Sequence, residues 1–361
     1  MKQPEVVIAP DSFKGSLTAT EAARAIGAGW ARIRPADRLR LLPQADGGEG
    51  TLAALAAADS AARWQAAGIV VGPDGRDLPG RWLRLGAGPA AAELALVSGL
   101  PLMRSPAPLT AGTHGLGAVL RAIAGARVRN TLVGLGGSAS TDGGAGLLTA
   151  LGARLRDASG RELPAGGAAL TRLARLDLTG LVRPPGLVVL SDVTAPLLGP
   201  SGAAAVFGPQ KGAGPEEIEI LERGLTRWAE VVGVDPQQPG AGAAGGTAYA
   251  LTAVLGARLE PGAPFIARAT GLVAAARDAD VLITGEGKVD ATTATGKTVG
   301  HALSLTGPGV RIVIAGEIET APAQSRAYSL SELAGGREPA LADPERWLAA
   351  AGAAAARDVD A

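Results

Sequence analysis

The chain has 361 residues, of which 47% are hydrophobic, and its 34 basic and 34 acidic side chains cancel. This length predicts about two domains, and the balanced charge with only 3% aromatic residues argues against nucleic-acid binding. The lack of cysteine excludes disulfides and thiolate chemistry, and the two histidines leave little room for a histidine-based zinc site or a Ser-His-Asp triad. No apolar run is long enough to span a membrane and the start shows no signal-peptide stretch, so we expect a cytoplasmic protein without membrane or nucleic-acid partners.

Short apolar runs alternate with alanine-rich helical stretches along the chain. The runs are nearly continuous, which is typical of strands that are covered on both faces of a parallel sheet. A capping box at Thr18 and Glu21 predicts a helix that reaches Gly27, and an amphipathic helix is predicted over 215–232. This alternation predicts an α/β fold with mostly parallel sheets, whose ligands bind in loops at the carboxyl ends of the strands. The predicted strands are Val6–Ala9, Leu39–Leu42, Thr131–Leu135, Leu187–Ser191, Val281–Thr284 and Arg311–Ala315.

The loops after the first two predicted strands carry charged and hydroxyl groups. Ser12 and Lys14 follow the first strand, at the entry of a helix whose free N–H groups favour anions. Asp46 and Glu49 follow the second strand, among glycines that let a ligand approach the backbone closely. Carboxylates there could hold Mg²⁺ or accept hydrogen bonds from hydroxyls. An ordinary capped turn is the alternative for each loop, but the combination of groups at strand ends favours a site.

Two glycine-rich segments are candidates for phosphate binding. Residues 134–146, which include Gly136, Gly137 and Ser138, open with a string that loosely fits a dinucleotide-binding turn. Their later glycines would weaken the first turns of the helix that such a turn requires, so a phosphate or carboxylate cradle fits better. The run around Gly245–Gly246 is equally compatible with phosphate binding and with close helix packing.

Charged residues follow the remaining predicted strands. Asp192 and Lys211 occupy adjoining loops, and such a pair suits phosphoryl transfer, with the carboxylate as metal ligand or base and the ammonium as phosphate clamp. Glu286, Asp290 and Lys297 form a dense set of charges after another buried strand. Lys297 stands in a Gly-Lys-Thr string, but the earlier glycine of a P-loop is missing, so the evidence for a Walker A motif is weak.

In this order, the segments resemble the bacterial glycerate kinase family of the type found in glucarate and galactarate breakdown. The resemblance runs from Val6 to about Gly316. It implies two α/β domains with the active site in the cleft between them. One domain is flavodoxin-like with a parallel sheet and comprises residues 1–69 and 271–361, and the other is an inserted, restriction-endonuclease-like domain of residues 70–270. The strings that carry the resemblance are Asp46-Gly-Gly-Glu-Gly-Thr, Gly136-Gly-Ser-Ala-Ser-Thr-Asp-Gly-Gly, Phe207-Gly-Pro-Gln-Lys-Gly and Thr284-Gly-Glu-Gly-Lys-Val-Asp.

The resemblance also implies a reaction, the phosphorylation of D-glycerate by ATP with Mg²⁺. The 2-hydroxyl is the first choice of acceptor, although the motifs do not separate 2- from 3-phosphorylation. The implied catalytic residues are Asp192, Lys14, Glu286 and Asp290, with Asp192 and Glu286 as the ligands of Mg²⁺. The implied substrate- and phosphate-binding residues are Ser12, Asp46, Glu49, Ser138, Lys211, Lys297, Gly136, Gly137, Gly245 and Gly246.

Three departures from the family pattern concern the binding of the acceptor. The segment from Thr113 to Ala118 lacks an arginine and a glutamate that many members carry, Ala195 stands where an asparagine is common, and Gln44 replaces a more usual apolar residue. These departures keep open a kinase of another small hydroxy acid on the same scaffold. An NAD-dependent oxidoreductase is a further alternative, which rests on the glycine string that begins at Gly134. A homo-oligomer stays open as well.

Overall fold

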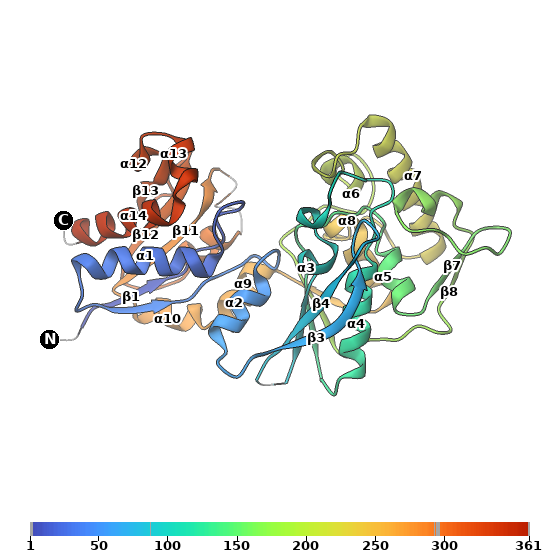
Figure 1. The fold of residues 1–361 in the computed structure, drawn as a ribbon, viewed down its shortest axis with the longest axis horizontal. Coiled ribbons are helices and arrows are strands. Elements are labelled where there is room, and N and C mark those ends of the chain that lie inside the picture. Colours follow the sequence, from blue (N-terminus) through green and yellow to red (C-terminus); the bar gives the residue numbers. More distant parts are fainter. Residues whose placement is uncertain (1–2, 87, 292, 294–296, 360–361) are drawn as a thin grey trace. The chain divides into compact units, whose positions relative to one another are not determined.

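The computed structural model describes residues 3–86, 88–291, 293 and 297–359, which form two compact units (Figure 1). Unit 1 contains both ends of the chain, and unit 2 contains most of its middle. Helix α2 (Thr51–Ala58) is divided between the two. Unit 1 comprises Met1–Asp46, Ala53–Ser60 and Gly262–Ala361, and unit 2 comprises Gly47–Leu52 and Ala61–Pro261.

Unit 1 is built on a five-stranded parallel sheet in the order β2-β1-β11-β12-β13. Helices α1 and α14 pack on one face, where Ile26 and Leu348 meet the strands, and α9, α10 and α11 cover the other through residues such as Leu272 (Figure 1). This cover on both faces explains why the central strands are apolar throughout. The strands are β1 (Glu5–Ile8), β2 (Arg38–Leu41), β11 (Val281–Val289), β12 (Val310–Ile318) and β13 (Arg326–Ser329). The helices are α1 (Ala19–Ile33), α9 (Gly262–Ala269), α10 (Leu272–Asp278), α11 (Thr298–Ser304), α12 (Leu330–Ala334), α13 (Arg337–Ala342) and α14 (Pro344–Asp358).

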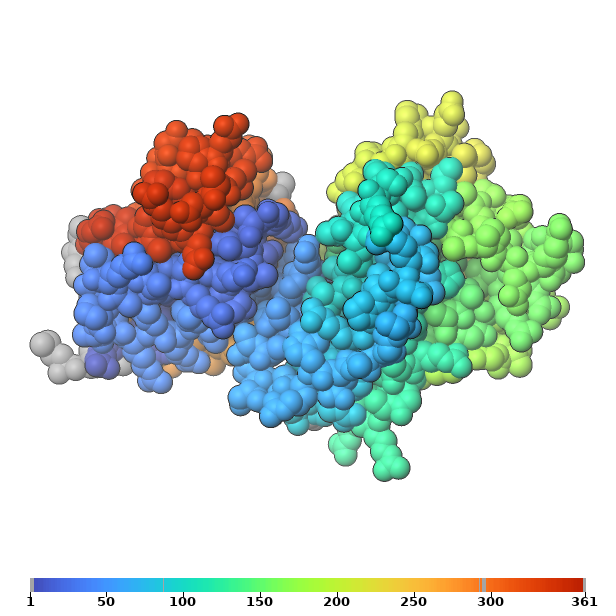
Figure 2. Space-filling model, in the orientation of Figure 1, coloured from blue at the N-terminus to red at the C-terminus, as the bar shows by residue number. Residues whose placement is uncertain are grey.

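The C-terminal helices are an integral part of unit 1. Helix α14 packs along α1, and a side chain on Gly29 of α1 would clash with the carbonyl oxygen of Ala349. Gly352 approaches the backbone of Ile26 in the same way. Figure 2 shows the C-terminal segment in red beside the blue N-terminal segment on one surface of this unit. Residues from the last part of the chain can therefore line a site that is built on β1.

Unit 2 contains a mixed six-stranded sheet in the order β10-β9-β6-β5-β4-β3. Strands β5, β6, β9 and β10 are parallel, whereas β3 and β4 form an antiparallel hairpin at one edge. Its strands are β3 (Arg63–Val71), β4 (Asp77–Arg84), β5 (Ala90–Glu93), β6 (Thr131–Gly134), β9 (Leu187–Leu190) and β10 (Arg258–Glu260), with the separate pair β7 (Arg154–Arg156) and β8 (Arg175–Asp177). Its helices are α3 (Ala95–Ser98), α4 (His114–Gly125), α5 (Ala145–Ala150), α6 (Ala203–Phe207), α7 (Pro215–Val232) and α8 (Ala243–Tyr249), with short η1 (Leu100–Leu102), η2 (Gly167–Arg172), η3 (Pro209–Lys211) and η4 (Ala250–Val254).

Most of the predicted elements are confirmed. All six predicted strands coincide with parallel strands, and the capping box at Thr18 and Glu21 is present. Strand β2 differs from the prediction, because as an edge strand it is only partly covered. The units divide at residues 46/47, 52/53, 60/61 and 261/262, whereas the sequence placed the domain boundaries at 69/70 and 270/271. The reason is that β3 pairs with β4 along its length, while Ala267 of α9 packs in the core of unit 1.

Candidate active site

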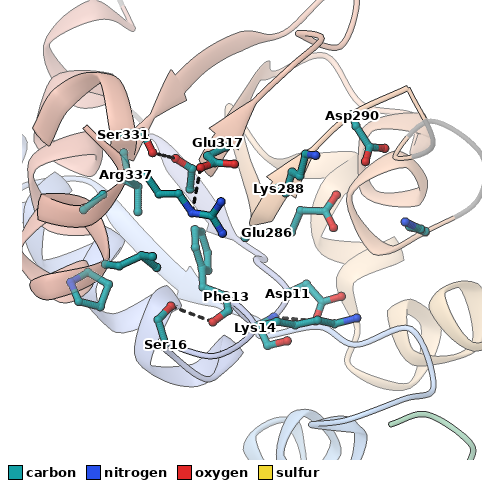
Figure 3. Close-up of a pocket in the computed structure, with 18 of the residues that line it drawn as sticks. Asp11, Phe13, Lys14, Ser16, Glu286, Lys288, Asp290, Glu317, Ser331 and Arg337 are labelled. Atoms are coloured by element: carbon teal, nitrogen blue, oxygen red, sulfur yellow. Dashed lines mark hydrogen bonds and ion pairs between the residues drawn. The ribbon is translucent and has the colours of Figure 1, made fainter. Parts of the chain in front are cut away.

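The order of the strands in unit 1 reverses between β1 and β11. Strand β2 lies on one side of β1, and β11, β12 and β13 follow on the other. In parallel α/β sheets, ligands bind beyond the carboxyl ends of the strands at such a reversal. A cavity of about 350 Å³ lies there, lined by residues that follow or end β1, β2, β11 and β12 and by residues of 330–344 (Figure 3). The predicted site residues that the structure brings together in it are Ser12, Lys14, Asp46, Glu286, Asp290 and Lys297.

Asp11 follows β1 and is held at both of its carboxylate oxygens. Oδ1 accepts a hydrogen bond from the backbone N–H of Ser12 at 2.6 Å, and Oδ2 accepts one from the hydroxyl of Thr298 at 2.6 Å. Burial, and next the negative charge of Asp46, raise the pKa of Asp11 to about 7. Both effects penalise the ionised form. Asp11 therefore changes its charge near neutral pH, and the sequence did not single it out.

Glu286 and Asp290 are joined through Thr293. The Thr293 hydroxyl donates to Glu286 Oε1 at 3.0 Å and accepts from the backbone N–H of Asp290 at 3.1 Å. Burial raises the pKa of Glu286, and the positive charges of Lys297 and Lys14 act in the opposite direction. Carboxylates and ammonium groups thus share one cavity, which is the combination that phosphoryl transfer requires.

The other side of the cavity is formed by residues that the sequence analysis did not identify. Arg337 Nε lies 3.2 Å from Glu317 Oε1, and the Ser331 hydroxyl donates to the carbonyl oxygen of Gly316 at 2.9 Å (Figure 3). These residues come from β12, α12 and α13. They lie at or beyond the end of the recognised strings, so no motif pointed to them. Gly296, in the Gly-Lys-Thr string, lies outside the described residues.

In unit 2, Lys211 is buried against the glycine-rich loop. Its side chain is 2% exposed, and its ammonium donates to the Ser138 hydroxyl at 2.8 Å and to the Ser140 carbonyl oxygen at 2.5 Å. Burial lowers the pKa of Lys211 to about 7, while the charge of Asp142 acts in the opposite direction. Lys211 supports the loop in this arrangement, and its predicted contact with phosphate stays a prediction.

The far end of the same loop is fixed by Asp142, which is fully buried. Its carboxylate accepts hydrogen bonds from the N–H and hydroxyl of Thr113 at 3.0 and 2.8 Å, and from the N–H groups of Gly144 and Gly146 at 3.0 and 3.1 Å. Thr113 begins the segment that departs from the family pattern. The departing segment therefore contributes, through Thr113, to the hydrogen bonds that hold the glycine-rich loop in place.

The glycines of unit 2 are required by close packing. Gly245 and Gly246 have φ values of 65° and 84°, and a side chain on Gly245 would clash with the carbonyl oxygen of Ser140. A side chain on Gly136 would clash with the backbone of Gly48. The sequence left phosphate binding and close packing as alternatives for Gly245–Gly246, and the structure shows close packing. Phosphate binding by this run stays a prediction.

Two more predicted residues lie in loops at the sheet of unit 2. Asp192 is partly buried directly after β9, and Glu49 is exposed in the loop before α2.

The backbone of the loop that contains Glu49 is held by Glu93, whose carboxylate oxygens accept hydrogen bonds from Gly50 N–H at 3.0 Å and Leu52 N–H at 2.9 Å. Burial raises the pKa of Glu93. The sequence analysis missed Glu93, because the alanine-rich strand that it ends was not predicted.

The backbone after β6 argues against a dinucleotide-binding turn. Strand β6 ends at Gly134, and α5 begins only at Ala145. The dinucleotide fingerprint instead requires the helix to open within the glycine motif. The intervening loop is folded around Asp142 and Lys211, which is compatible with a cradle for a small anion.

The donor groups in the unit 1 cavity are of the type that Mg²⁺ prefers. Across the described ranges, no group of three or more His, Cys, Asp or Glu side chains is placed to hold a metal ion. Mg²⁺, however, is usually bound by one or two carboxylates together with substrate phosphates. Asp11, Asp46 and Glu286 supply such oxygens in unit 1. The other predicted ligand, Asp192, belongs to unit 2.

The sequence model of the Glycerate kinase family matches residues 6–360. The chain belongs to this family. The chain is 40% identical over 327 residues to a glycerate kinase from Bacillus subtilis (strain 168), which covers 87% of this chain and 85% of that protein. It is 41% identical over 304 residues to a glycerate 2-kinase from Escherichia coli (strain K12), which covers 81% of this chain and 79% of that protein.

A solved structure confirms the fold of this glycerate kinase family member at the level of its α/β class. A crystal structure from Salmonella typhimurium LT2, assigned as a glycerate kinase 2, superposes with a TM-score of 0.80 at 38% identity and covers 99% of both chains. The family prediction and the prediction of a kinase are thereby confirmed. Among the described residues, no helix combines the length and the apolar character needed to cross a bilayer.

Proposed function

We propose that this chain transfers the γ-phosphoryl group of ATP to a hydroxyl of D-glycerate, and that the 2-hydroxyl is the acceptor. The observation that carries the proposal is the cavity at the strand reversal of unit 1, in a member of the glycerate kinase family. Lysines and carboxylates converge there from three neighbouring strands. The relatives named glycerate kinase and glycerate 2-kinase support the choice of acceptor.

In the proposed reaction, the glycerate hydroxyl oxygen bonds to the γ-phosphorus while the bond to the β,γ-bridging oxygen breaks. The electron pair of that bond leaves with ADP, and the hydroxyl proton passes to a carboxylate of the site. Lys14 and Lys297 are exposed at the cavity and would neutralise the phosphates. Asp290 and Glu286 are the nearby carboxylates. Positioning and charge stabilisation supply most of the catalysis in such a transfer.

Glu286 of unit 1 is a proposed ligand of Mg²⁺. Asp192 of unit 2 stays a predicted ligand. When bound, the ion neutralises charge on the transferring phosphoryl group. Asp11, with Asp46 beside it, adds to the negative field that attracts a cation into this cavity. The backbone N–H groups of Gly136 and Gly137 in unit 2 are proposed to hold an anionic group of a substrate, with Ser138 beside them.

The finer fold assignment is also a proposal. Counted along unit 1 alone, the strand order β2-β1-β11-β12-β13 is 2-1-3-4-5, which is the flavodoxin-like order and supports that assignment. The restriction-endonuclease-like description of the inserted unit rests on the family resemblance. A cytoplasmic location and a homo-oligomer stay predictions.

The test is ADP release from Mg-ATP with D-glycerate, compared with L-glycerate and with no acceptor. A coupled enolase reaction without mutase then detects 2-phosphoglycerate. ADP release that depends on D-glycerate, together with an enolase signal, is the expected result. ADP release without that signal would assign the 3-hydroxyl. Release only with another hydroxy acid would transfer the proposal to that substrate, and the segment from Thr113 to Ala118 would be the first place to look for the cause.

A further inference from the structure

The cavity of unit 1 has two sides of different chemistry. One side carries the carboxylates and lysines at the ends of β1 and β11. The other is formed largely by α12, α13 and the start of α14, and includes apolar side chains as well as polar ones. Figure 3 shows Arg337, Ser331 and Glu317 on that second side, away from Asp290 and Glu286. The apolar lining there comes from Phe13, Leu330, Ala340, Leu341 and Pro344.

The polar groups of the second side are available to a ligand. The ion pair of Arg337 with Glu317 is solvent-exposed, with the arginine side chain 72% exposed, so it contributes little stability and is readily rearranged. The Ser331 hydroxyl uses its hydrogen on the Gly316 carbonyl but keeps lone pairs that can accept. A carboxylate, a guanidinium and a hydroxyl thus border an apolar surface.

Glycerate has no apolar part that could pack against such a surface, because every carbon of this three-carbon acid carries oxygen. A nucleoside matches it, since the base has apolar faces with a polar edge and the ribose presents hydroxyl groups to a carboxylate. We propose that the wall formed by Phe13, Leu330 and Leu341 binds the base of the phosphoryl donor, and that Glu317 accepts hydrogen bonds from its ribose. This inference deepens the proposed function and rests on it for the identity of the donor.

This assignment orients the donor in the cavity. With the base against the C-terminal helices, the phosphate chain runs toward the other side, where Lys14 and Lys297 lie. The transferring phosphoryl group then lies next to the carboxylates at the ends of β1 and β11. In this arrangement, the side formed by the C-terminal helices binds the nucleoside, and the side at the ends of β1 and β11 binds the phosphates and carries the catalytic groups.

The first test compares two ligands on the unaltered protein, by calorimetry with Mg²⁺ and without glycerate. ADP and inorganic pyrophosphate each carry a diphosphate, and pyrophosphate has one more ionisable oxygen. Tighter binding of ADP, which carries the smaller charge, therefore reports a contribution of the nucleoside. We expect ADP to bind at least about tenfold more tightly, which corresponds to about 1.4 kcal/mol. Equal affinities would overturn the inference.

The second test uses two leucines on neighbouring C-terminal helices. Leu341 lines the cavity and is 52% exposed, and Leu333 is 39% exposed and is not among the lining residues. We expect Leu341→Asn to weaken ADP binding about fivefold or more while pyrophosphate binding and the KM for glycerate stay unchanged. The control Leu333→Asn should alter none of these. Circular dichroism and thermal melting show whether each variant is folded.

The outcomes separate this inference from the proposed function. A raised KM for glycerate with unchanged ADP affinity in Leu341→Asn would assign the wall to the acceptor and overturn the inference. Unchanged affinities for both ligands would overturn it as well. If Leu341→Asn weakens ADP binding but the unaltered protein does not phosphorylate glycerate, the proposed function is refuted and the inference about nucleoside binding is supported. If Leu341→Asn does not fold, the comparison of ADP with pyrophosphate decides.

Discussion

The substitution Lys211→Met separates the free-energy cost of a buried amine from its support of the glycine-rich loop. Methionine keeps the length and apolar character of the lysine stem but donates no hydrogen bond. Burial lowers the pKa of Lys211 from 10.5 to about 7. At about 1.4 kcal/mol per pKa unit, keeping this group charged costs up to about 5 kcal/mol. Its bonds to Ser138 and Ser140 offset about 1.5–3 kcal/mol each.

These opposing contributions nearly cancel, so we expect Lys211→Met to change the free energy of unfolding at pH 7 by less than about 2 kcal/mol. Lys211→Ala leaves a cavity instead and should cost about 2–5 kcal/mol. The catalytic rate should respond differently. Once the loop has lost its support, we expect kcat of Lys211→Met to fall more than about tenfold, since a small displacement of a positioning loop is costly.

The pH dependence provides the sharper check. Because the pKa of Lys211 is lower in the folded than in the unfolded protein, the unfolded chain binds more protons between pH 7 and 10, and stability rises with pH there. For one such group the rise is about 2 kcal/mol between pH 7 and 9. Lys211→Met should lack this rise in urea unfolding. Equal slopes for the two proteins would refute the reasoning, because burial would then not disfavour the ammonium.

Three further changes test other parts of the site. The pKa of Asp11 is raised from 3.8 to about 7, so the folded protein binds more protons than the unfolded chain between pH 4 and 7 and loses stability as the pH rises through that window. Asp11→Asn should therefore be more stable than the wild type by about 2 kcal/mol at pH 8 in the presence of EDTA, and no more stable at pH 4. Thermal unfolding at the two pH values measures this difference. Gly245→Ala forces a side chain onto a backbone with φ of 65° and against Ser140, and should lower stability by about 2 kcal/mol or more in urea; unaltered stability would contradict the packing role. Asp192→Asn should lower turnover more than about tenfold with an unchanged circular dichroism spectrum, and near-normal activity would remove Asp192 from the catalytic set.

The sequence predicted six parallel strands and missed β5, β10 and β13. The six were found because their physical signal is local. A strand such as β6, buried on both faces, must be apolar at successive positions, and that run is visible without knowledge of its neighbours. Strand β3 of the hairpin β3–β4 does contain an apolar run, from Ala66 to Val71, but most of the strand is exposed, including Ile69 and Val71. Its register also shifts between Ala66 and Gly68. The apolar run therefore does not mark a strand that is covered on both faces.

The site residues divide in the same way. Lys14 and Glu286 stand in strings of glycine and charge directly after predicted strands, and such strings can be found in the sequence. Arg337 and Glu93 stand in no string. Arg337 reaches the cavity because α12 and α13 pack against each other and against β12, and Glu93 acts on a loop more than forty positions earlier in the chain. Their roles depend on tertiary contacts that no short motif encodes.

The register of the sheet explains why the carboxylates of unit 1 repel one another. Ile8 of β1 pairs with Ile283 of β11, and the alignment continues past the strand, since Asp11 N–H donates to the Gly285 carbonyl oxygen at 2.8 Å. Asp11, just beyond the end of β1, therefore lies beside Gly285 and Glu286 of β11, and Asp46 follows β2, which is the neighbour of β1 on its other side. The repulsion that destabilises this cluster without ligand is relieved by a bound cation. The stability that Asp11→Asn is expected to gain above pH 7 therefore measures the cost of ionising a carboxylate that is buried beside Asp46 and Glu286.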